Sequence, residues 1–155
     1  MGDQRHLLKD LRLQLRRARL RPVYEVKTSV ERIPSTQPPR RVLEFGTIEG
    51  EENLAQAIVV RLLTPKGELE ELAHPDYGSR LHELIGRPNT PERRDLVKLY
   101  TLESLNAEPR IANVVSVVVS EVPAQPARVD VHIEVQPVGR TDIVSIGPLE
   151  LELAP

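Results

Sequence analysis

The sequence predicts an α+β fold in which three short helices pack on a C-terminal antiparallel β-meander, preceded by an N-terminal amphipathic basic helix and a proline-rich linker. Three observations lead to this prediction. Leucine and isoleucine recur at helical spacing between residues 54 and 105, valine and isoleucine alternate with polar residues over 129–136, and prolines cluster in 34–41. A repeat of three to four residues indicates a helix with one apolar face, whereas a repeat of two indicates a half-buried strand.

The composition narrows the class of protein. The chain has 155 residues and no cysteine, which excludes disulfide frameworks, thiolate zinc sites and cysteine nucleophiles. It has no apolar run long enough to span a membrane, and its charged start predicts no secretory signal, so we expect an intracellular or particle-borne protein. Aromatic residues make up only 3% of the chain, so the core must be small and aliphatic. This favours a subunit stabilised by its neighbours over an enzyme with a deep pocket.

The first 21 residues carry seven basic and two acidic side chains, a net charge of +5, so the remainder carries −7. The spacing predicts a helix that Pro22 ends. Its apolar stripe comprises Leu7, Leu11 and Leu15, and its charged stripe comprises Arg12, Arg16 and Arg19. A solvated surface helix and a helix that docks on a protein partner both fit this pattern. Nucleic-acid or membrane-surface binding fits less well, because no aromatic residue is interleaved with the cations.

A domain boundary is predicted in the proline-rich segment. Residues 23–33 alternate loosely and could pair as a strand, whereas the three prolines of 34–41 fit neither a helix interior nor a central strand. We therefore expect residues 1–42 to form an N-terminal extension and residues 43–155 to form the compact domain.

Three helices are expected in that domain. The first carries Leu54, Ile58 and Leu62 and ends at Pro65. After a turn and a short exposed strand over 67–72, Ser79 is placed to cap a second, short helix that Gly86 closes. The third begins at Thr90-Pro91, a capping side chain followed by proline, and runs roughly to residue 107.

The last third of the chain predicts three strands. In 114–122, Val115, Val117 and Val119 are expected on one face and Val114, Val118 and Val122 on the other, so both faces should be covered. In 129–136, apolar and polar residues alternate, which predicts one wet face. Residues 143–153 supply the third strand, interrupted at Gly147-Pro148.

The junction between the third helix and the first strand is Glu108-Pro109-Arg110-Ile111. Two opposite charges flanking a rigid proline fill a core poorly but present a fixed docking point. The alternative is that Pro109 merely ends the helix and that Glu108 and Arg110 form a solvated ion pair of little energetic value.

The order of these motifs resembles a known family. The segment Pro-Asp-Tyr-Gly-Ser-Arg-Leu-His-Glu-Leu over 75–84, the Glu-Pro-Arg-Ile motif over 108–111 and the terminal meander are similar to the GPW or gene-25-like baseplate wedge proteins. These include the wedge subunits of contractile phage tails, the TssE subunit of type VI secretion, and counterparts in extracellular injection systems. The resemblance covers about residues 44–154, and the two motifs in this order are specific.

The resemblance implies a structural subunit of a six-fold, hetero-oligomeric baseplate. It implies that Glu108, Pro109 and Arg110 hold the core bundle of other wedge subunits. Tyr77, Gly78, Leu81 and Leu84 match the family loop and are expected to set its shape at the protein-binding surface. The first ring of sheath protein would be templated by strand addition, at either the strand over 128–136 or that over 149–153. The central spike, hub or tube proteins are further candidate partners, and assembly in the cytoplasm into a phage-tail-like particle is expected. The extension over 1–42 is not typical of the family, and the type of machine stays open.

Enzyme and metal sites are disfavoured by the sequence. Glu68, Glu70 and Glu71 could mimic a glycosidase pair, but no neighbouring aromatic would bury them or line a sugar cleft. The four histidines have no ligand spacing, so no metal, cofactor or catalytic residue is expected. The alternative function is an adaptor that recruits an acidic partner or nucleic acid through the basic N-terminal helix.

Overall fold

The computed structural model describes residues 10–18, 21–26, 28–33 and 40–154. Their backbone contacts divide the chain into two compact units. One contains the described residues up to Gln56, and the other begins at Ala57 and contains the C-terminal sheet. Within the described ranges, no helix is long and apolar enough to cross a membrane.

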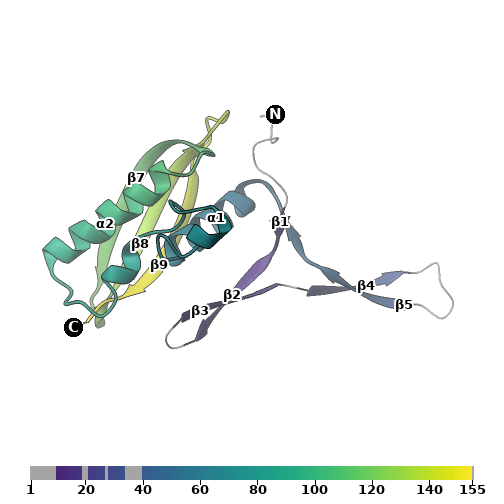
Figure 1. Cartoon of the computed structure of the whole chain (residues 1–155), viewed down its shortest axis with the longest axis horizontal. Coiled ribbons are helices and arrows are strands. Elements are labelled where there is room, and N and C mark those ends of the chain that lie inside the picture. The colour runs from purple at the N-terminus through teal and green to yellow at the C-terminus, as the bar shows by residue number, and fades with distance from the viewer. Residues whose placement is uncertain (1–9, 19–20, 27, 34–39, 155) are drawn as a thin grey trace. The chain divides into compact units, whose positions relative to one another are not determined.

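The C-terminal unit is built on a three-stranded antiparallel meander, as the sequence predicts. Its strands are β7 (Ile111–Val122), β8 (Gln125–Pro137) and β9 (Val144–Glu152), in the order β7-β8-β9. Helix α2 (Pro91–Asn106) contacts β7 and runs along one face of the sheet (Figure 1). The predicted start of α2 is confirmed, because the Thr90 hydroxyl accepts a hydrogen bond from the Arg93 backbone N–H at 3.3 Å and Pro91 is the first helical residue.

Strand β8 supplies the centre of the core. Its four alternate apolar residues, Val129, Val131, Ile133 and Val135, are buried. The opposite face is polar: Arg128 forms ion pairs with Asp130 at 3.0 Å and with Glu150 at 2.7 Å. The alternation of period two therefore gives the predicted wet face, and β8 is paired on both sides.

Strand β7 differs from the prediction. It is an edge strand, and two of its valines, Val115 and Val118, are 44% and 51% exposed, so its second face is not covered. A register shift between Val114 and Ser116 reverses the alternation, so that Val114 and Val117 lie on the same side of the ladder, paired with Val135 and Ile133. The extra residue of a β-bulge causes such a reversal, and an unbroken run of valines gives no sign of where the bulge falls.

Only two of the three predicted helices are α-helices. The first, α1 (Gly50–Leu63), agrees with the prediction. The second is a single 3₁₀ turn, η3 (Leu81–Glu83), and the predicted strand near residue 70 is another, η2 (Glu70–Leu72). The segment between Gly78 and Gly86, both with positive φ, is too short to offset the cost of nucleating an α-helix.

The N-terminal unit is made of short antiparallel ladders followed by the start of α1. Its six strands are β1 (Asp10–Leu11), β2 (Leu13–Ala18), β3 (Arg21–Val26), β4 (Thr28–Ile33), β5 (Arg40–Phe45) and β6 (Thr47–Ile48). They pair as β1-β6, β2-β3 and β4-β5. The single strand that 23–33 was expected to form is instead divided between β3 and β4, which pair with different partners. Residues 34–39 of the predicted linker lie outside the described residues.

The predicted N-terminal helix is wrong for the residues that the structure describes. Leu11 lies in β1, Leu15 and Arg16 lie in β2, and Arg12 lies between these two strands; Leu7 and Arg19 lie outside the described residues. The same leucines also satisfy a repeat of two, because Leu13 falls midway between Leu11 and Leu15. The strand repeat prevails because β3 offers β2 an antiparallel partner. Pro22 is tolerated in β3 because both strands of a two-stranded ladder are edge strands.

The first strands of this unit are bonded to α1. The Gln56 side chain accepts a hydrogen bond from the Leu13 backbone N–H at 2.8 Å and donates one to the Leu11 carbonyl at 2.9 Å. Arg12 forms an ion pair of 2.7 Å with Glu52. These contacts fix the base of the β2-β3 ladder to the first turns of the helix.

Truncating a side chain should lower the free energy of unfolding by different amounts on the two faces of the sheet. Ile133→Ala removes a fully buried side chain and should lower the free energy of unfolding by about 3 kcal/mol, because it leaves a cavity. Val118→Ala on the exposed face should cost less than about 1 kcal/mol. Urea unfolding of both variants measures this, and equal costs would contradict the assignment of the buried face.

Candidate functional site

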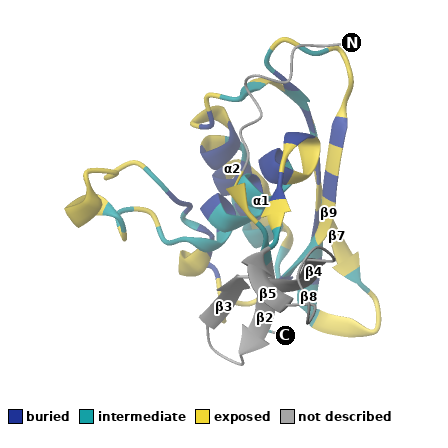
Figure 2. Cartoon of the chain, turned by 90° about the vertical axis from the view of Figure 1, so that its right-hand side faces the viewer, coloured by how far each residue is buried: buried dark blue, intermediate teal, exposed yellow. Residues whose placement is uncertain are grey.

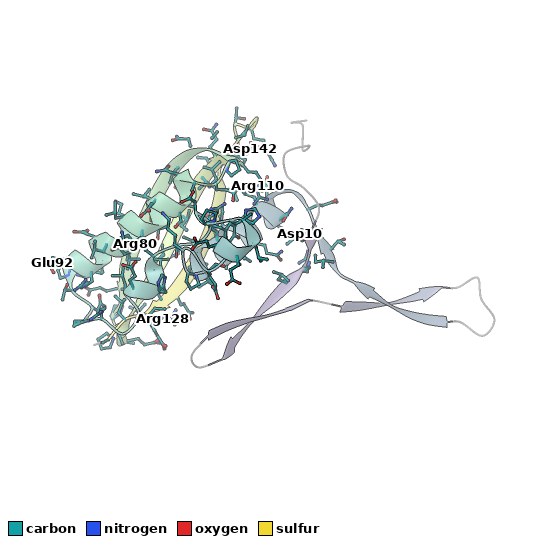
Figure 3. The ribbon with its side chains drawn as sticks, in the orientation of Figure 1. Asp10, Arg80, Glu92, Arg110, Arg128 and Asp142 are labelled. Carbon is teal, nitrogen blue, oxygen red and sulfur yellow. The ribbon has the colours of Figure 1, made fainter. Side chains whose placement is uncertain are left out.

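The Glu108-Pro109-Arg110 motif forms a tight turn between α2 and β7. The Glu108 backbone N–H donates to the Leu105 carbonyl at 3.1 Å, and the Ile111 N–H donates to the Glu108 carbonyl at 3.1 Å. Pro109 occupies the second position of this turn, where its fixed φ is favourable, and it is exposed. The Arg110 carbonyl then accepts from the Val138 N–H at 2.9 Å, which ties the turn to the end of β8. The motif is therefore held rigidly at the seam between helix and sheet, where Figure 3 labels Arg110.

Glu108 is buried, with 5% of its surface exposed. One carboxylate oxygen, Oε1, accepts from Arg110 Nε at 2.7 Å and from the Arg110 backbone N–H at 3.4 Å. The other, Oε2, accepts from Arg61 Nε at 3.3 Å and lies 3.2 Å from Arg61 Nη2. Burying an unpaired carboxylate costs free energy because the charge loses its hydration. Here two guanidinium groups pair with the same carboxylate.

These contacts determine the charge of Glu108. Burial by itself raises the pKa of the carboxyl, but the hydrogen bond and charge of Arg110, together with the charge of Arg61, outweigh burial and hold the pKa of Glu108 below its ordinary value. Glu108 is therefore ionised at neutral pH and keeps both arginines in place.

Arg61 extends the cluster to the family loop. Its guanidinium carbon lies 4.4 Å from the centroid of the Tyr77 ring, a cation–π arrangement. Burial raises the pKa of the half-buried Tyr77, and the charge of Arg61 opposes that rise without cancelling it. The phenol is thus neutral, and the ring serves as a packing surface for the cation.

Arg110 is held at one end only. Its side chain is 21% exposed, and its Nε is occupied by Glu108. Its two terminal amino groups make no hydrogen bond to any residue in the described part of the chain. The guanidinium is thus oriented from within the subunit and keeps free donors for another molecule.

The loop beside this cluster cannot tolerate a side chain at Gly78. Gly78 has a φ of +107°, and a Cβ there would lie 2.6 Å from the Thr64 carbonyl oxygen. The next residue, Ser79, donates its backbone N–H to that same carbonyl at 2.8 Å, and its hydroxyl accepts from the Leu81 N–H at 3.2 Å. The glycine therefore allows the loop to lie directly against the end of α1.

The structure places the residues predicted for the site in two groups. It brings Tyr77 to the Glu108 cluster through Arg61, whereas Gly78, Leu81 and Leu84 are buried and shape the loop from inside. Figure 2 shows buried residues in dark blue, among them parts of α1 and α2. Whether these residues contact a partner stays a prediction.

Arg61 is not among the site residues that the sequence predicts. The signal was present, because Arg61 adjoins the apolar stripe of Ile58 and Leu62, and a cation on the buried side of a helix requires a buried counter-charge. Glu108, which the sequence places at the end of the third helix beside Arg110, is a candidate for that counter-charge.

The alternative sites gain nothing from the structure. Glu68, Glu70 and Glu71 are exposed, on a turn and on η2. Among the residues that the structure describes, no group of three or more histidine and acidic side chains could hold a metal ion.

The Glu108 cluster predicts a defined pH dependence. Because the pKa of Glu108 is lowered by folding, its contribution to stability is present above its unfolded pKa, near 4.5, and is lost as the pH falls through the folded value. Glu108→Gln should lower the free energy of unfolding by about 2 kcal/mol at pH 7, and this deficit relative to wild type should shrink below about pH 4.5.

Denaturant unfolding from pH 7 to pH 3 measures the deficit. Glu103→Gln is the matched control, because Glu103 forms an exposed ion pair with Lys66 and should cost less than about 1 kcal/mol. A Glu108→Gln deficit that stays constant over this range would exclude the ionised, doubly paired carboxylate.

Comparison with known proteins agrees with the resemblance seen in the motifs. The family model of the baseplate wedge protein gp25 matches residues 48–139, which is more than half of the chain. No curated protein matches the sequence. Among solved structures, a crystal structure from Geobacter sulfurreducens described as a "putative tail lysozyme" is similar to this chain, with a TM-score of 0.53 and 25% sequence identity over 68% of this chain and 92% of that chain. The chain belongs to the gp25 baseplate wedge family.

Proposed function

We propose that this chain is a structural baseplate subunit of a contractile injection system and that it docks on the core bundle of other wedge subunits through Glu108-Pro109-Arg110. The proposal rests on the guanidinium group of Arg110. Its Nε donates to a buried carboxylate, whereas its terminal amino groups have no partner among the described residues. Family membership supports the baseplate setting.

The geometry suits an anchor. An arginine fork can bind a carboxylate through two parallel hydrogen bonds or bridge the free carbonyls at the end of a partner helix. The turn that contains Pro109 fixes the backbone beforehand, and Glu108 fixes the side chain, so less conformational entropy is lost on docking. An anchor of this kind, once desolvated in an interface, typically contributes about 2 kcal/mol or more.

We infer that the chain does not hydrolyse glycosides, although the similar Geobacter structure is described as a lysozyme candidate. A glycosidase needs one carboxylic acid with a raised pKa and a second carboxylate at a fixed separation across a sugar site. Glu68, Glu70 and Glu71 are exposed side chains on a turn and on η2, not a pair enclosed across a sugar site.

A free sheet edge supports the templating of sheath protein. Of the two candidate strands from the sequence, the one over 128–136 is excluded, because β8 is paired on both sides. The remaining edges are β7 and β9. An incoming extended segment could satisfy unpaired N–H and C=O groups at either of them.

We favour β7 over β9 as the templating edge. β9 contains Gly147 and Pro148, and a proline cannot donate to a ladder. β7 has no proline from Ile111 to Val122, and beside its edge it exposes Val115 and Val118, which a partner strand could cover. The first sheath ring is the proposed partner, in a six-fold hetero-oligomer that assembles in the cytoplasm, with spike, hub or tube proteins as further neighbours.

Substitution of the anchor should separate folding from assembly. Arg110→Ala should cost about 1–2 kcal/mol in the isolated chain, because Glu108 keeps Arg61 as its partner, and unfolding should stay cooperative. The same variant should fail to co-purify with the wedge subunits of its own particle when they are expressed together.

The matched control is Arg87→Ala, which removes an exposed arginine away from the motif and should assemble normally. Normal assembly of Arg110→Ala would refute the docking role. A chain that is unfolded at ordinary temperature would show instead that Arg110 is purely architectural.

Site-specific crosslinking tests which edge strand of the sheet binds the sheath protein. The chain has no cysteine, so Val118→Cys in β7 and Glu152→Cys in β9 each introduce one unique reactive thiol. In assembled particles, a crosslinker on residue 118 should capture the sheath protein and one on residue 152 should not. Capture from residue 152 alone would assign the templating role to β9, and capture from neither residue would exclude templating by this sheet.

A further inference from the structure

The N-terminal unit contains two ladders of the same design, β2-β3 and β4-β5. Each consists of two strands of six residues joined by six register pairs. An isolated two-stranded ladder is at best marginally stable in water, because it cannot bury enough apolar surface. Two such ladders in succession indicate a surface that another molecule completes.

The apolar positions fall at the open end of each ladder. In β2-β3, the register pairs Leu13 with Val26 and Leu15 with Tyr24. In β4-β5, it pairs Thr28 with Phe45 and Val30 with Leu43. Pairs at alternate positions share one face of a ladder, so each ladder has an apolar or largely apolar row on one face.

The basic positions fall at the opposite, connected end of each ladder. Arg17 is paired with Pro22 and Ala18 with Arg21, while Arg32 is paired directly with Arg41. Like charges directly opposite one another destabilise a ladder, so the Arg32–Arg41 pair opposes hairpin formation unless an anion neutralises it. Residues 10–45 carry nine basic and four acidic side chains, a net charge of +5, so they supply no excess of anions themselves.

We propose that the basic ends of the two ladders dock on an acidic surface of another protein subunit. The anions of that surface would remove the repulsion between Arg32 and Arg41, and the apolar rows would be covered by the same partner. A protein surface can supply carboxylates and apolar side chains together, whereas a nucleic-acid backbone supplies phosphates alone beside these strands. This docking uses none of the residues of the Glu108 cluster and stands apart from it.

The Arg32–Arg41 pair allows an experiment in which hairpin stability and binding move in opposite directions. In Arg41→Glu, the pair becomes one of opposite charges, so backbone amide protection of β4 and β5 should rise in hydrogen exchange. The probe is a fluorescent peptide of about ten residues in which glutamate and valine alternate, titrated with the full chain. The affinity of the chain for this peptide should fall about fivefold in the same variant, since replacing Arg41 by Glu lowers the charge of the basic end by two units.

Lys98→Glu is the matched control, because it makes the same change of charge at an exposed position on α2. It should leave both amide protection in β4 and β5 and peptide affinity unchanged. Equal loss of affinity in both variants would reduce the effect to net charge and overturn the proposal. Tighter binding of a short DNA duplex than of the peptide, or self-association that excludes the peptide, would also overturn it.

Discussion

The buried carboxylate of Glu108 is the interaction on which the site depends. It joins Arg61 of α1 to Arg110 at the start of the sheet, across a turn that begins where α2 ends. Because both guanidinium groups bind the same ionised carboxylate, the three elements meet in a defined way without a large aromatic core. The same bond that stabilises the subunit also orients Arg110, so internal stability and the presentation of an anchor have one physical origin.

Much of the C-terminal unit could be predicted from the sequence, and little of the N-terminal unit could. The alternation around Ile133 and the cap at Thr90 are local signals, and they gave β8 and the start of α2. The position of the bulge near Val114 has no local signal in the sequence, because any residue of a valine run can be the unpaired one. Around Leu13 the leucines satisfied helix and strand periods alike, and only the pairing partner β3 decides between them.

The same contrast applies to the site. The Glu-Pro-Arg motif is contiguous and was identified directly, whereas the contribution of Arg61 comes from 47 residues away and depends on the tertiary fold. Glu108 and Arg110 do form an ion pair, as the architectural alternative required, but the pair is buried on the glutamate side and open on the arginine side. An ion pair that is buried at Glu108 and open at Arg110 can stabilise the subunit and also bind a partner.

On the proposed function, Arg110 binds another subunit while Glu108 holds its side chain from within. The most direct measurement is a high-resolution map of the assembled baseplate that resolves this side chain. In that map, Arg110 Nε should still donate to the Glu108 carboxylate, and the terminal amino groups of Arg110 should lie within hydrogen-bonding distance of a carbonyl or carboxylate of a neighbouring wedge subunit. A map in which every donor of Arg110 is satisfied by its own chain, with no neighbour in reach, would contradict it.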